Sequence, residues 1–262
     1  MTEKRCRVVA VANQKGGVGK TTTALNLAAG LAELDRRVLL VDLDPQGNST
    51  TGCGVELEQH EPTTCEVLLN ELPADQVIRR IESMKFDLLP ANGDLTAAEV
   101  ALLELQDRAG VLKEELKPLL GRYHHIIIDC PPALNVLTLN ALTAADGVLI
   151  PMQCEYYALE GLTALLSTIE QVQDTVNPSL EIEGLVRTMY DIRNNLSGAV
   201  SRQLQEHFGD KLFTTVIPRN VRVAEAPSYG QSVILYDRES RGAIAYLGLA
   251  GEYLRRWGVS RR

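Results

Sequence analysis

The sequence lacks paired cysteines. Its five cysteines include no C-x-x-C pair, and its four histidines have no metal-ligand spacing, so neither a zinc site nor an iron–sulfur cluster is indicated. We expect five reduced thiols, as is usual in the cytosol. His124 and His125 stand just before an apolar run, and we expect them at a solvated strand start.

Long hydrophobic runs are also absent. No apolar stretch approaches the ~18 residues that a membrane span requires, and the N-terminus shows no apolar signal-peptide core followed by a small-residue cleavage site. We therefore expect a cytoplasmic protein. The chain has 262 residues, of which 45% are hydrophobic, enough for one large core. We expect a single domain over residues 1–262.

An excess of basic residues is missing as well. The formal net charge is -8, which argues against a simple nucleic-acid binder. The charge is uneven, because residues 187–262 hold 12 Lys+Arg and 7 Asp+Glu, whereas residues 1–186 carry a balance of -13. This asymmetry is compatible with one face that meets a polyanion and equally with a solvated basic surface.

What the sequence does contain is an alternation of apolar runs and helical segments. This alternation predicts an α/β fold with a doubly wound, mostly parallel sheet flanked by helices. The acidic stretch from Glu56 to Glu82 is the least regular part. In this fold class, ligands bind at the carboxyl ends of the strands. The expected strands are residues 7–13, 36–45, 86–92, 124–132, 147–153, 181–189 and 212–220, and the expected helices include residues 21–35, 135–145 and 159–176.

The stretch ANQKGGVGKTTTALNLA, residues 12–28, resembles a phosphate-binding loop with one departure. The pattern G-x-x-x-x-G-K-[ST] places its first glycine at position 14, where the chain has Gln14 followed by a second lysine, Lys15. The glycines let backbone N–H groups face phosphate oxygens, and the next helix adds its positive dipole end. We expect Lys20 to reach the β- and γ-phosphates and the Thr21 hydroxyl to ligate Mg²⁺.

Aspartates close two of the apolar strands. The run ending in Asp129 is the partner motif that holds Mg²⁺, usually through water. Cys130 follows it, where many ATPases place a glutamate that polarises the attacking water. We therefore expect Asp44, two residues beyond Asp42, to position this water and to lie at the metal. The alternative is that Asp44 is a turn residue that caps Gln46 or the glycine after it.

These motifs together resemble the deviant Walker A ATPases of the ParA/MinD family, and in particular its Soj-like chromosome-partitioning ParA branch. The matching stretches are the loop at residues 15–22, RVLLVDLDPQGNSTTG, IIIDCPPAL, PMQCEYYALEGL and TVIPRNVRVAEAPSYGQSVILYD, which span nearly the whole chain. The resemblance implies a P-loop NTPase fold, ATP and Mg²⁺ as cofactors, and an ATP-sandwiched homodimer. It further implies slow hydrolysis that a ParB/Spo0J-type centromere-binding protein stimulates.

The resemblance also gives a function to the second lysine of the loop, Lys15. It implies that Lys15 reaches across the dimer to the ATP of the other subunit, where a cation offsets the charge of two facing nucleotides. The alternative is a solvated loop lysine. By this correspondence the residues that bind ATP are Lys15, Gly16, Gly17, Val18, Gly19, Lys20, Thr21 and Thr22.

The residues alone do not decide whether the nucleotide carries adenine or guanine. The N-K-x-D motif of guanine sites is absent, but the strand ending in TMYD closes with an aspartate and has Met189 in place of the lysine. The resemblance favours adenine, with Pro218 and Asn220 near the base. We include Met189 in the expected site.

Two hypotheses compete for what the ATP-bound dimer binds, DNA or a membrane. In the first, the ATP dimer binds duplex DNA without sequence preference and partitions chromosomes or plasmids on the nucleoid. The resemblance points to Arg193 and Arg222 for DNA, and we add Arg219 and Arg241 from nearby basic loops. The absence of a helix-turn-helix or an aromatic platform fits such nonspecific binding.

The second output is that of a MinD-like positioning ATPase, which enters the membrane interface through a C-terminal amphipathic helix. Here the tail GLAGEYLRRWGVSRR is interrupted by glycines. We expect it to pack on the domain and end in a short basic segment, without stable membrane association. A regulator of another machine, such as flagellar placement, is a third and weaker hypothesis.

Overall fold

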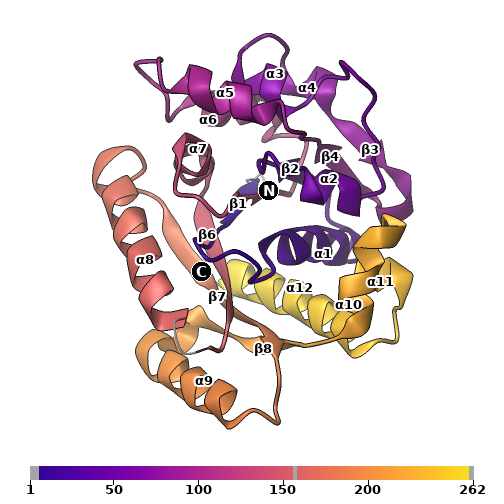
Figure 1. Cartoon of the computed structure of the whole chain (residues 1–262), viewed down its shortest axis with the longest axis vertical. Coiled ribbons are helices and arrows are strands. Elements are labelled where there is room, and N and C mark those ends of the chain that lie inside the picture. The colour runs from indigo at the N-terminus through magenta and orange to yellow at the C-terminus, as the bar shows by residue number, and fades with distance from the viewer. Residues whose placement is uncertain (1–5, 156–157, 260–262) are drawn as a thin grey trace.

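The computed structural model describes residues 6–155 and 158–259. Its strands form one eight-stranded sheet in the order β3-β4-β2-β5-β1-β6-β7-β8 (Figure 1). Every neighbouring pair is parallel except β3 and β4, which are antiparallel. The predicted doubly wound, mostly parallel sheet is confirmed. The strands are β1 (Arg7–Val11), β2 (Val38–Asp42), β3 (Arg79–Ile81), β4 (Phe86–Leu89), β5 (His125–Asp129), β6 (Gly147–Gln153), β7 (Glu181–Tyr190) and β8 (Leu212–Pro218).

Helices cover both faces of the sheet (Figure 1). They are α1 (Lys20–Glu33), α2 (Asn48–Gly52), α3 (Thr64–Leu68), α4 (Ala74–Val77), α5 (Leu95–Leu102), α6 (Val111–Leu116), α7 (Val136–Ala144), α8 (Ala158–Thr175), α9 (Asn195–Phe208), α10 (Val221–Glu225), α11 (Val233–Tyr236) and α12 (Arg241–Val259). Short 3-10 turns are η1 (Glu82–Met84), η2 (Lys117–Leu119), η3 (Gly209–Lys211) and η4 (Ala226–Tyr229).

The core consists of two apolar clusters, one on each face of the sheet. In β1, Val8 and Ala10 belong to the cluster beneath α5–α8, whereas Val9 and Val11 belong to the cluster beneath α1 and α12. Successive side chains of a strand point to opposite faces. A central strand covered on both sides must therefore be apolar at every position, which is why the runs in the sequence are continuous rather than alternating.

The irregular acidic stretch contains more structure than the sequence predicts. Thr63 and Glu66 form a capping box that starts α3. β3 is an edge strand of three residues, and its Arg80 is exposed. Apolar periodicity did not reveal β3 because so short a charged strand has almost no pattern of its own.

The expectation of a solvated start for the fourth strand is wrong for His125. This residue is fully buried, because β1 and β2 flank β5 on both sides and α12 covers its start. The ring of His125 makes edge contacts with those of Tyr253 and Trp257. Burial lowers the pKa of His125 to about 3, so the imidazole is neutral at physiological pH.

The C-terminal helix α12 packs on the domain, as expected. Its own residues Leu249 and Tyr253 are buried, and the helix lies against α1 and β8. Its Glu252 carboxylate accepts hydrogen bonds of 2.8 Å from the backbone N–H groups of Thr214 and Thr215. The apolar face of α12 is thus part of the core. The basic end that was expected after it, residues 260–262, lies outside the described residues.

Among the helices in the described part of the chain, none combines the length and apolar character needed to cross a membrane.

Candidate nucleotide-binding site

The glycine loop, residues 12–19, connects β1 to α1, and hydrogen bonds from neighbouring strands hold it in place. Gly17 and Gly19 have φ angles of +74° and +88°, which side chains disfavour. The Thr188 hydroxyl donates a hydrogen bond of 2.7 Å to the carbonyl of Val18, and the Gln153 amide donates one of 3.0 Å to the carbonyl of Gly17. Side chains at the ends of β6 and β7 therefore bind two carbonyl groups of the loop from the interior of the protein.

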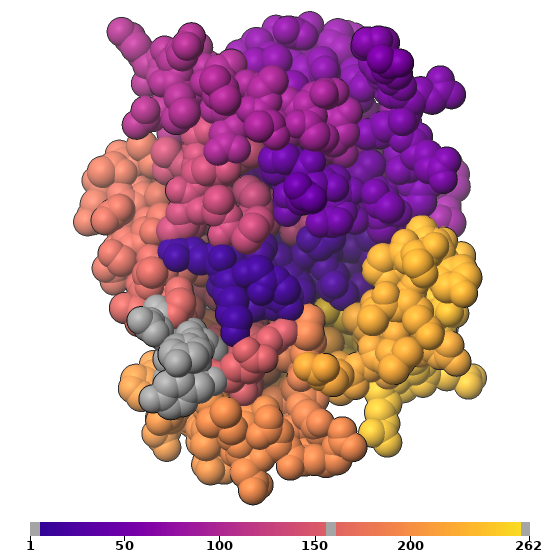
Figure 2. Space-filling view, in the orientation of Figure 1, coloured from indigo at the N-terminus to yellow at the C-terminus, as the bar shows by residue number. Residues whose placement is uncertain are grey.

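The outer side of the loop is open. A Cβ atom on Gly16 or Gly17 would meet nothing within 4 Å, and Figure 2 shows the indigo segment that contains the loop at the middle of this face. α1 begins directly after the loop at Lys20. The positive end of a helix of 14 residues thus faces this space, as phosphate binding requires.

The two lysines of the loop have different surroundings. The Lys20 ammonium is buried and donates a hydrogen bond of 3.3 Å to the backbone carbonyl of Lys15. Burial lowers the pKa of Lys20, against the attraction of Asp129 and Asp44. The Lys15 ammonium lies at the rim, where it forms an exposed ion pair of 2.6 Å with Glu155. Only Lys20 is directed into the interior of the loop.

Two carboxylates meet at the carboxyl ends of adjacent strands. Asp42 of β2 and Asp129 of β5 are register partners. Asp42 accepts hydrogen bonds of 2.8 Å from the backbone N–H and 2.7 Å from the hydroxyl of Thr50. Asp129 accepts one of 2.8 Å from the hydroxyl of Ser49, and the Thr21 side chain lies close enough to lower the pKa of this carboxyl group. Burial is the main cause that raises the pKa of both carboxyl groups, and repulsion by Asp44 at Asp42 and by Asp42 at Asp129 adds to it.

This arrangement fits a magnesium ion. The second carboxylate oxygen of Asp129, Oδ1, is buried and has no hydrogen-bond partner among the described residues. The Thr21 hydroxyl lies against the same carboxylate. Mg²⁺ prefers such oxygen donors and keeps several waters, and its charge would favour the ionised form of carboxyl groups whose pKa values are raised mainly by burial. Asp129 and Thr21 are the residues placed to hold it, and Asp44 lies buried nearby.

The structure shows the turn function of Asp44 directly. Its carboxylate accepts a hydrogen bond of 3.0 Å from the backbone N–H of Gln46, and its carbonyl accepts one of 2.8 Å from that of Gly47. The Asp44 carboxylate is also close enough to Lys20 to raise the pKa of that lysine. The turn contact is therefore compatible with a function of Asp44 at the nucleotide site. The water-positioning function of Asp44 stays a prediction.

Gly47 fixes this turn, and its replacement by alanine is expected to destabilise the protein by ~1–3 kcal/mol. Its φ is +61°, and an added Cβ would lie 2.7 Å from the carbonyl oxygen of Ala91. Urea denaturation measures the free energy of unfolding. Gly93→Ala is the matched control, because a Cβ there meets nothing within 4 Å. Equal stability of the two variants would contradict the prediction.

The residues expected near the base lie along neighbouring strand ends. Met189, with a φ of +48°, has its terminal methyl group 3.7 Å from the position of a Cβ on Gly19. Pro218 ends β8 and is paired with Tyr190 of β7. The Asn220 side-chain oxygen accepts a hydrogen bond from the backbone N–H of Val223 and so caps α10. The structure brings Met189 to the loop, while contact of these residues with a base stays a prediction.

Sequence reasoning missed the residues that support the site. Ser49 and Thr50 hold the carboxylates, and their signal was the polar run GNSTT directly after a strand end. Gln153 of β6 and Thr188 of β7 hold the loop; both stand in stretches noted in the sequence, PMQCEYYALEGL and TMYD, which gave no indication of this contact. A hollow of about 270 Å³ also opens beside the loop, lined by Thr21, Thr22, Leu25, Asn26, Asn48, Thr51, Gly52 and Pro227.

The arginines expected to bind DNA form two groups near the ends of β7 and β8. Arg193 is paired with Asp191 at 2.8 Å with its side chain 85% exposed, and Arg219 attracts the same aspartate. Arg222 of α10 is half exposed and pairs with Glu225 and Asp237. Arg241 is exposed at the start of α12, which contacts α10. All are accessible, and most already have acidic partners.

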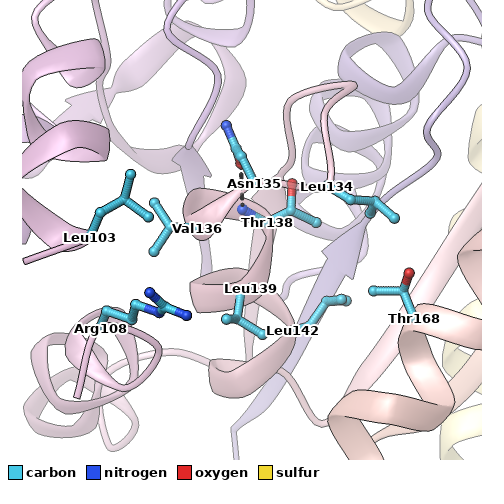
Figure 3. Close-up of a pocket in the computed structure, with 9 residues that line it drawn as sticks. All are labelled: Leu103, Arg108, Leu134, Asn135, Val136, Thr138, Leu139, Leu142 and Thr168. Atoms are coloured by element: carbon cyan, nitrogen blue, oxygen red, sulfur yellow. Dashed lines mark hydrogen bonds between the residues drawn. The ribbon is translucent and has the colours of Figure 1, made fainter. Parts of the chain in front are cut away.

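A second hollow, of about 330 Å³, lies beside α7. In Figure 3, Leu103 and Arg108 approach α7 from one side and Thr168 of α8 faces it from the other. The Asn135 side chain accepts a hydrogen bond of 3.1 Å from the backbone N–H of Thr138, which starts α7. The lining is mostly apolar and contains none of the predicted site residues, so this hollow is separate from the nucleotide site.

The comparisons with known proteins agree with this geometry. A family model described as an AAA domain matches residues 6–182. The chain is 51% identical to the chromosome partitioning protein ParA of Caulobacter vibrioides, over 98% of this chain and 97% of that protein. It is 50% identical to the sporulation initiation inhibitor protein Soj of Bacillus subtilis, over 94% of this chain and 97% of that protein.

Among solved structures, one similar chain is described as the cobyrinic acid a,c-diamide synthase of Mycobacterium smegmatis with a bound ATP analog and magnesium. It is 41% identical, with a TM-score of 0.85, over 98% of this chain and 97% of that chain. The glycine loop, the paired carboxylates and these relatives support one conclusion. The chain is an ATPase with ATP and Mg²⁺ as its cofactors, and it belongs to the Soj-like ParA branch of the ParA/MinD family.

Proposed function

We propose that this protein is an ATP-dependent switch for partitioning chromosomes or plasmids, built as a single domain over residues 1–262. ATP binding drives a sandwich homodimer, the dimer binds duplex DNA nonspecifically on the nucleoid, and hydrolysis stimulated by a ParB/Spo0J-type partner releases it. The observation that carries the proposal is the pair of lysines in one loop. Lys20 is buried within the loop, and Lys15 lies at its open rim.

The surroundings of Lys15 support a switch. Its partner Glu155 is 51% exposed, and the Lys15 side chain is 38% exposed. Exposed ion pairs contribute only ~0–1 kcal/mol, so the lysine is readily exchanged to a stronger anion. The phosphates of an ATP molecule bound by a second subunit are such an anion. Dimerisation through Lys15 therefore depends on the nucleotide.

The catalytic functions follow from position. We propose that Lys20 neutralises charge on the β- and γ-phosphates, that Thr21 and Asp129 hold the metal, and that Asp44 orients the attacking water. Bound Mg²⁺ would supply positive charge at the phosphates. Ser49 keeps the Asp129 carboxylate in place through its hydrogen bond of 2.8 Å.

DNA binding is assigned to Arg193, Arg219, Arg222 and Arg241. Their guanidinium groups are accessible, and each of the first three lies within reach of an acidic side chain that phosphate would have to displace. Phosphate contacts of this kind position a protein on DNA without reading its sequence. A dimer doubles the number of such contacts, so their contributions to affinity add across both subunits, while the overall charge of -8 per chain is screened at longer range by salt.

The alternative, a MinD-like membrane-associated ATPase, is less well supported. The apolar side of α12 is buried in the core, so within the described residues this helix has no free apolar face for lipid.

The name of the Mycobacterium smegmatis structure suggests amide synthesis, but that chain is 41% identical, whereas the ParA and Soj relatives are 50–51% identical. The proposed function is therefore that of the ParA and Soj relatives.

The switch is tested by binding to a random-sequence duplex at two salt concentrations. The wild-type protein is expected to bind with ATP and not with ADP, and the slope of log affinity against log salt is expected to be roughly 0.9 per phosphate contact. Lys15→Ala should lose DNA binding because it loses the dimer, while it still binds ATP. Arg222→Glu should lose DNA binding while it still dimerises.

The control is Arg108→Glu, which makes the same charge change between α5 and α6 and is expected to bind DNA normally. Cosedimentation with anionic liposomes in ATP and in ADP tests the membrane alternative in parallel. Tight DNA binding by the ADP form, or normal binding by Arg222→Glu, would show that the proposed switch is wrong.

A further inference from the structure

A basic hollow lies at the opposite edge of the sheet from the nucleotide site. It encloses about 400 Å³ and is lined by Ala32, Asp35, Arg36, Arg37, Val38, Arg80, Lys85, Asp87, Arg122 and Tyr123. Val38 is the first residue of β2, whereas Asp42 at the nucleotide site is the last. The two sites are thus separated by the length of this strand, roughly 13 Å at ~3.3 Å per residue.

The cations of the basic hollow come from segments that are far apart in the sequence. Arg36 and Arg37 belong to the turn between α1 and β2. Arg80 belongs to β3, Lys85 to the segment that joins β3 and β4, and Arg122 to the loop before β5. With the carboxylates of Asp35 and Asp87, the lining carries five positive and two negative side chains. Convergence of so many like charges is costly unless an anion offsets it.

Asp87, one of the two acidic residues of the lining, is already engaged. Asp87 accepts hydrogen bonds of 3.2 Å from Arg80 and 2.7 Å from the Tyr123 hydroxyl. Lys85 pairs with Glu33, which lies outside the lining. By contrast, Arg36, Arg37 and Arg122 form no salt bridge with any residue that the structure describes. The Nε of Arg36 is moreover buried without a hydrogen-bond acceptor in the described chain.

The hollow is held in shape by contacts between its segments. The backbone N–H of Arg37 donates a hydrogen bond of 3.0 Å to the His124 ring, and its carbonyl accepts one of 2.8 Å from the backbone N–H of His124. The Tyr123 hydroxyl joins this loop to Asp87 of β4. The Arg122 guanidinium lies 5.8 Å from the centre of the Tyr123 ring. A preformed cluster of guanidinium groups suits bidentate binding of phosphate oxygens.

We propose that this basic hollow binds a compact oligophosphate anion, either free or as the phosphate chain of a nucleotide. The arginines without a salt bridge bind its oxygens, Arg36 from the turn before β2 and Arg122 from the loop before β5. The concave shape and the volume of about 400 Å³ admit a small anion, whereas a duplex would need protruding side chains. The proposal does not depend on the partitioning function.

The test is isothermal titration of the full chain carrying Lys20→Ala, which disables the glycine loop, with sodium tripolyphosphate and, separately, with ADP, both without Mg²⁺. One equivalent of tripolyphosphate is expected to bind per chain. Adding Arg36→Gln and Arg122→Gln should weaken this binding at least 10-fold. Adding Arg202→Gln, an exposed arginine of α9, should leave it unchanged. Binding of ADP with the same sensitivity would identify the nucleotide as a source.

Thermal unfolding checks that the variants fold, and Arg122→Gln alone, at an exposed position, gives a second measure. The double change should leave binding of the otherwise wild-type ATP form to duplex DNA unaffected. Absence of tripolyphosphate binding to the Lys20→Ala protein, or binding that the arginine changes do not weaken, would overturn the proposal. Loss of duplex binding together with no tripolyphosphate binding would reassign these arginines to DNA and overturn it equally.

Discussion

Lys20→Ala is expected to weaken ATP binding by at least ~10²-fold, to below detection by isothermal titration. Lys20 is 7% exposed, and its ammonium group is positioned by a hydrogen bond to the Lys15 carbonyl of the glycine loop. A charge held in this way acts on phosphate with little screening, and charge-assisted hydrogen bonds are the strong ones. Its removal leaves the phosphates beside three aspartates with no lysine at the loop interior.

Lys15→Ala is the matched control for this experiment. It removes a lysine from the same loop, but one at the rim whose partner is Glu155. We expect it to bind ATP as a monomer with an affinity near that of the wild-type protein. Near wild-type ATP affinity in Lys20→Ala would refute the nucleotide site proposed here, whatever the second lysine does.

Asp44→Ala is expected to bind ATP and dimerise, yet to hydrolyse ATP ~10²-fold or more slowly. The reason is that Cys130 follows Asp129 and has no carboxylate to orient water. Asp44 is the buried acid next to the paired carboxylates that remains for this step. Size-exclusion chromatography with ATP should show a stable dimer, and single-turnover phosphate release measures the rate.

Asp44→Asn separates the two functions of this residue. The asparagine side-chain oxygen can still accept the hydrogen bond from the backbone N–H of Gln46, so the turn is kept while the negative charge is lost. Slow hydrolysis by both variants supports a carboxylate that positions water. If Asp44→Asn turns over normally and only Asp44→Ala is slow, Asp44 is a turn residue.

Much of the fold was predictable because its signals are local. A strand that is buried on both faces has to be apolar almost throughout, so the central strands β1, β2, β5 and β6 appear in the sequence as nearly continuous apolar runs. The glycine loop needs glycine where φ is positive, and this requirement fixes the motif at Gly17 and Gly19. β3 escaped prediction because a three-residue edge strand is stabilised by pairing with β4 rather than by its own sequence.

The sequence by itself predicted a phosphate-binding loop, a magnesium carboxylate at Asp129 and a mostly parallel α/β sheet, and the structure confirms the sheet. Only the tertiary structure decided which residues meet. Ser49 contacts Asp129 across 80 positions, and Lys15 contacts Glu155 across 140. His125 is buried because α12 returns over the start of β5. Such partners are set by strand order and register, and no local pattern carries that information, because pairing energies depend on side chains that are distant along the chain.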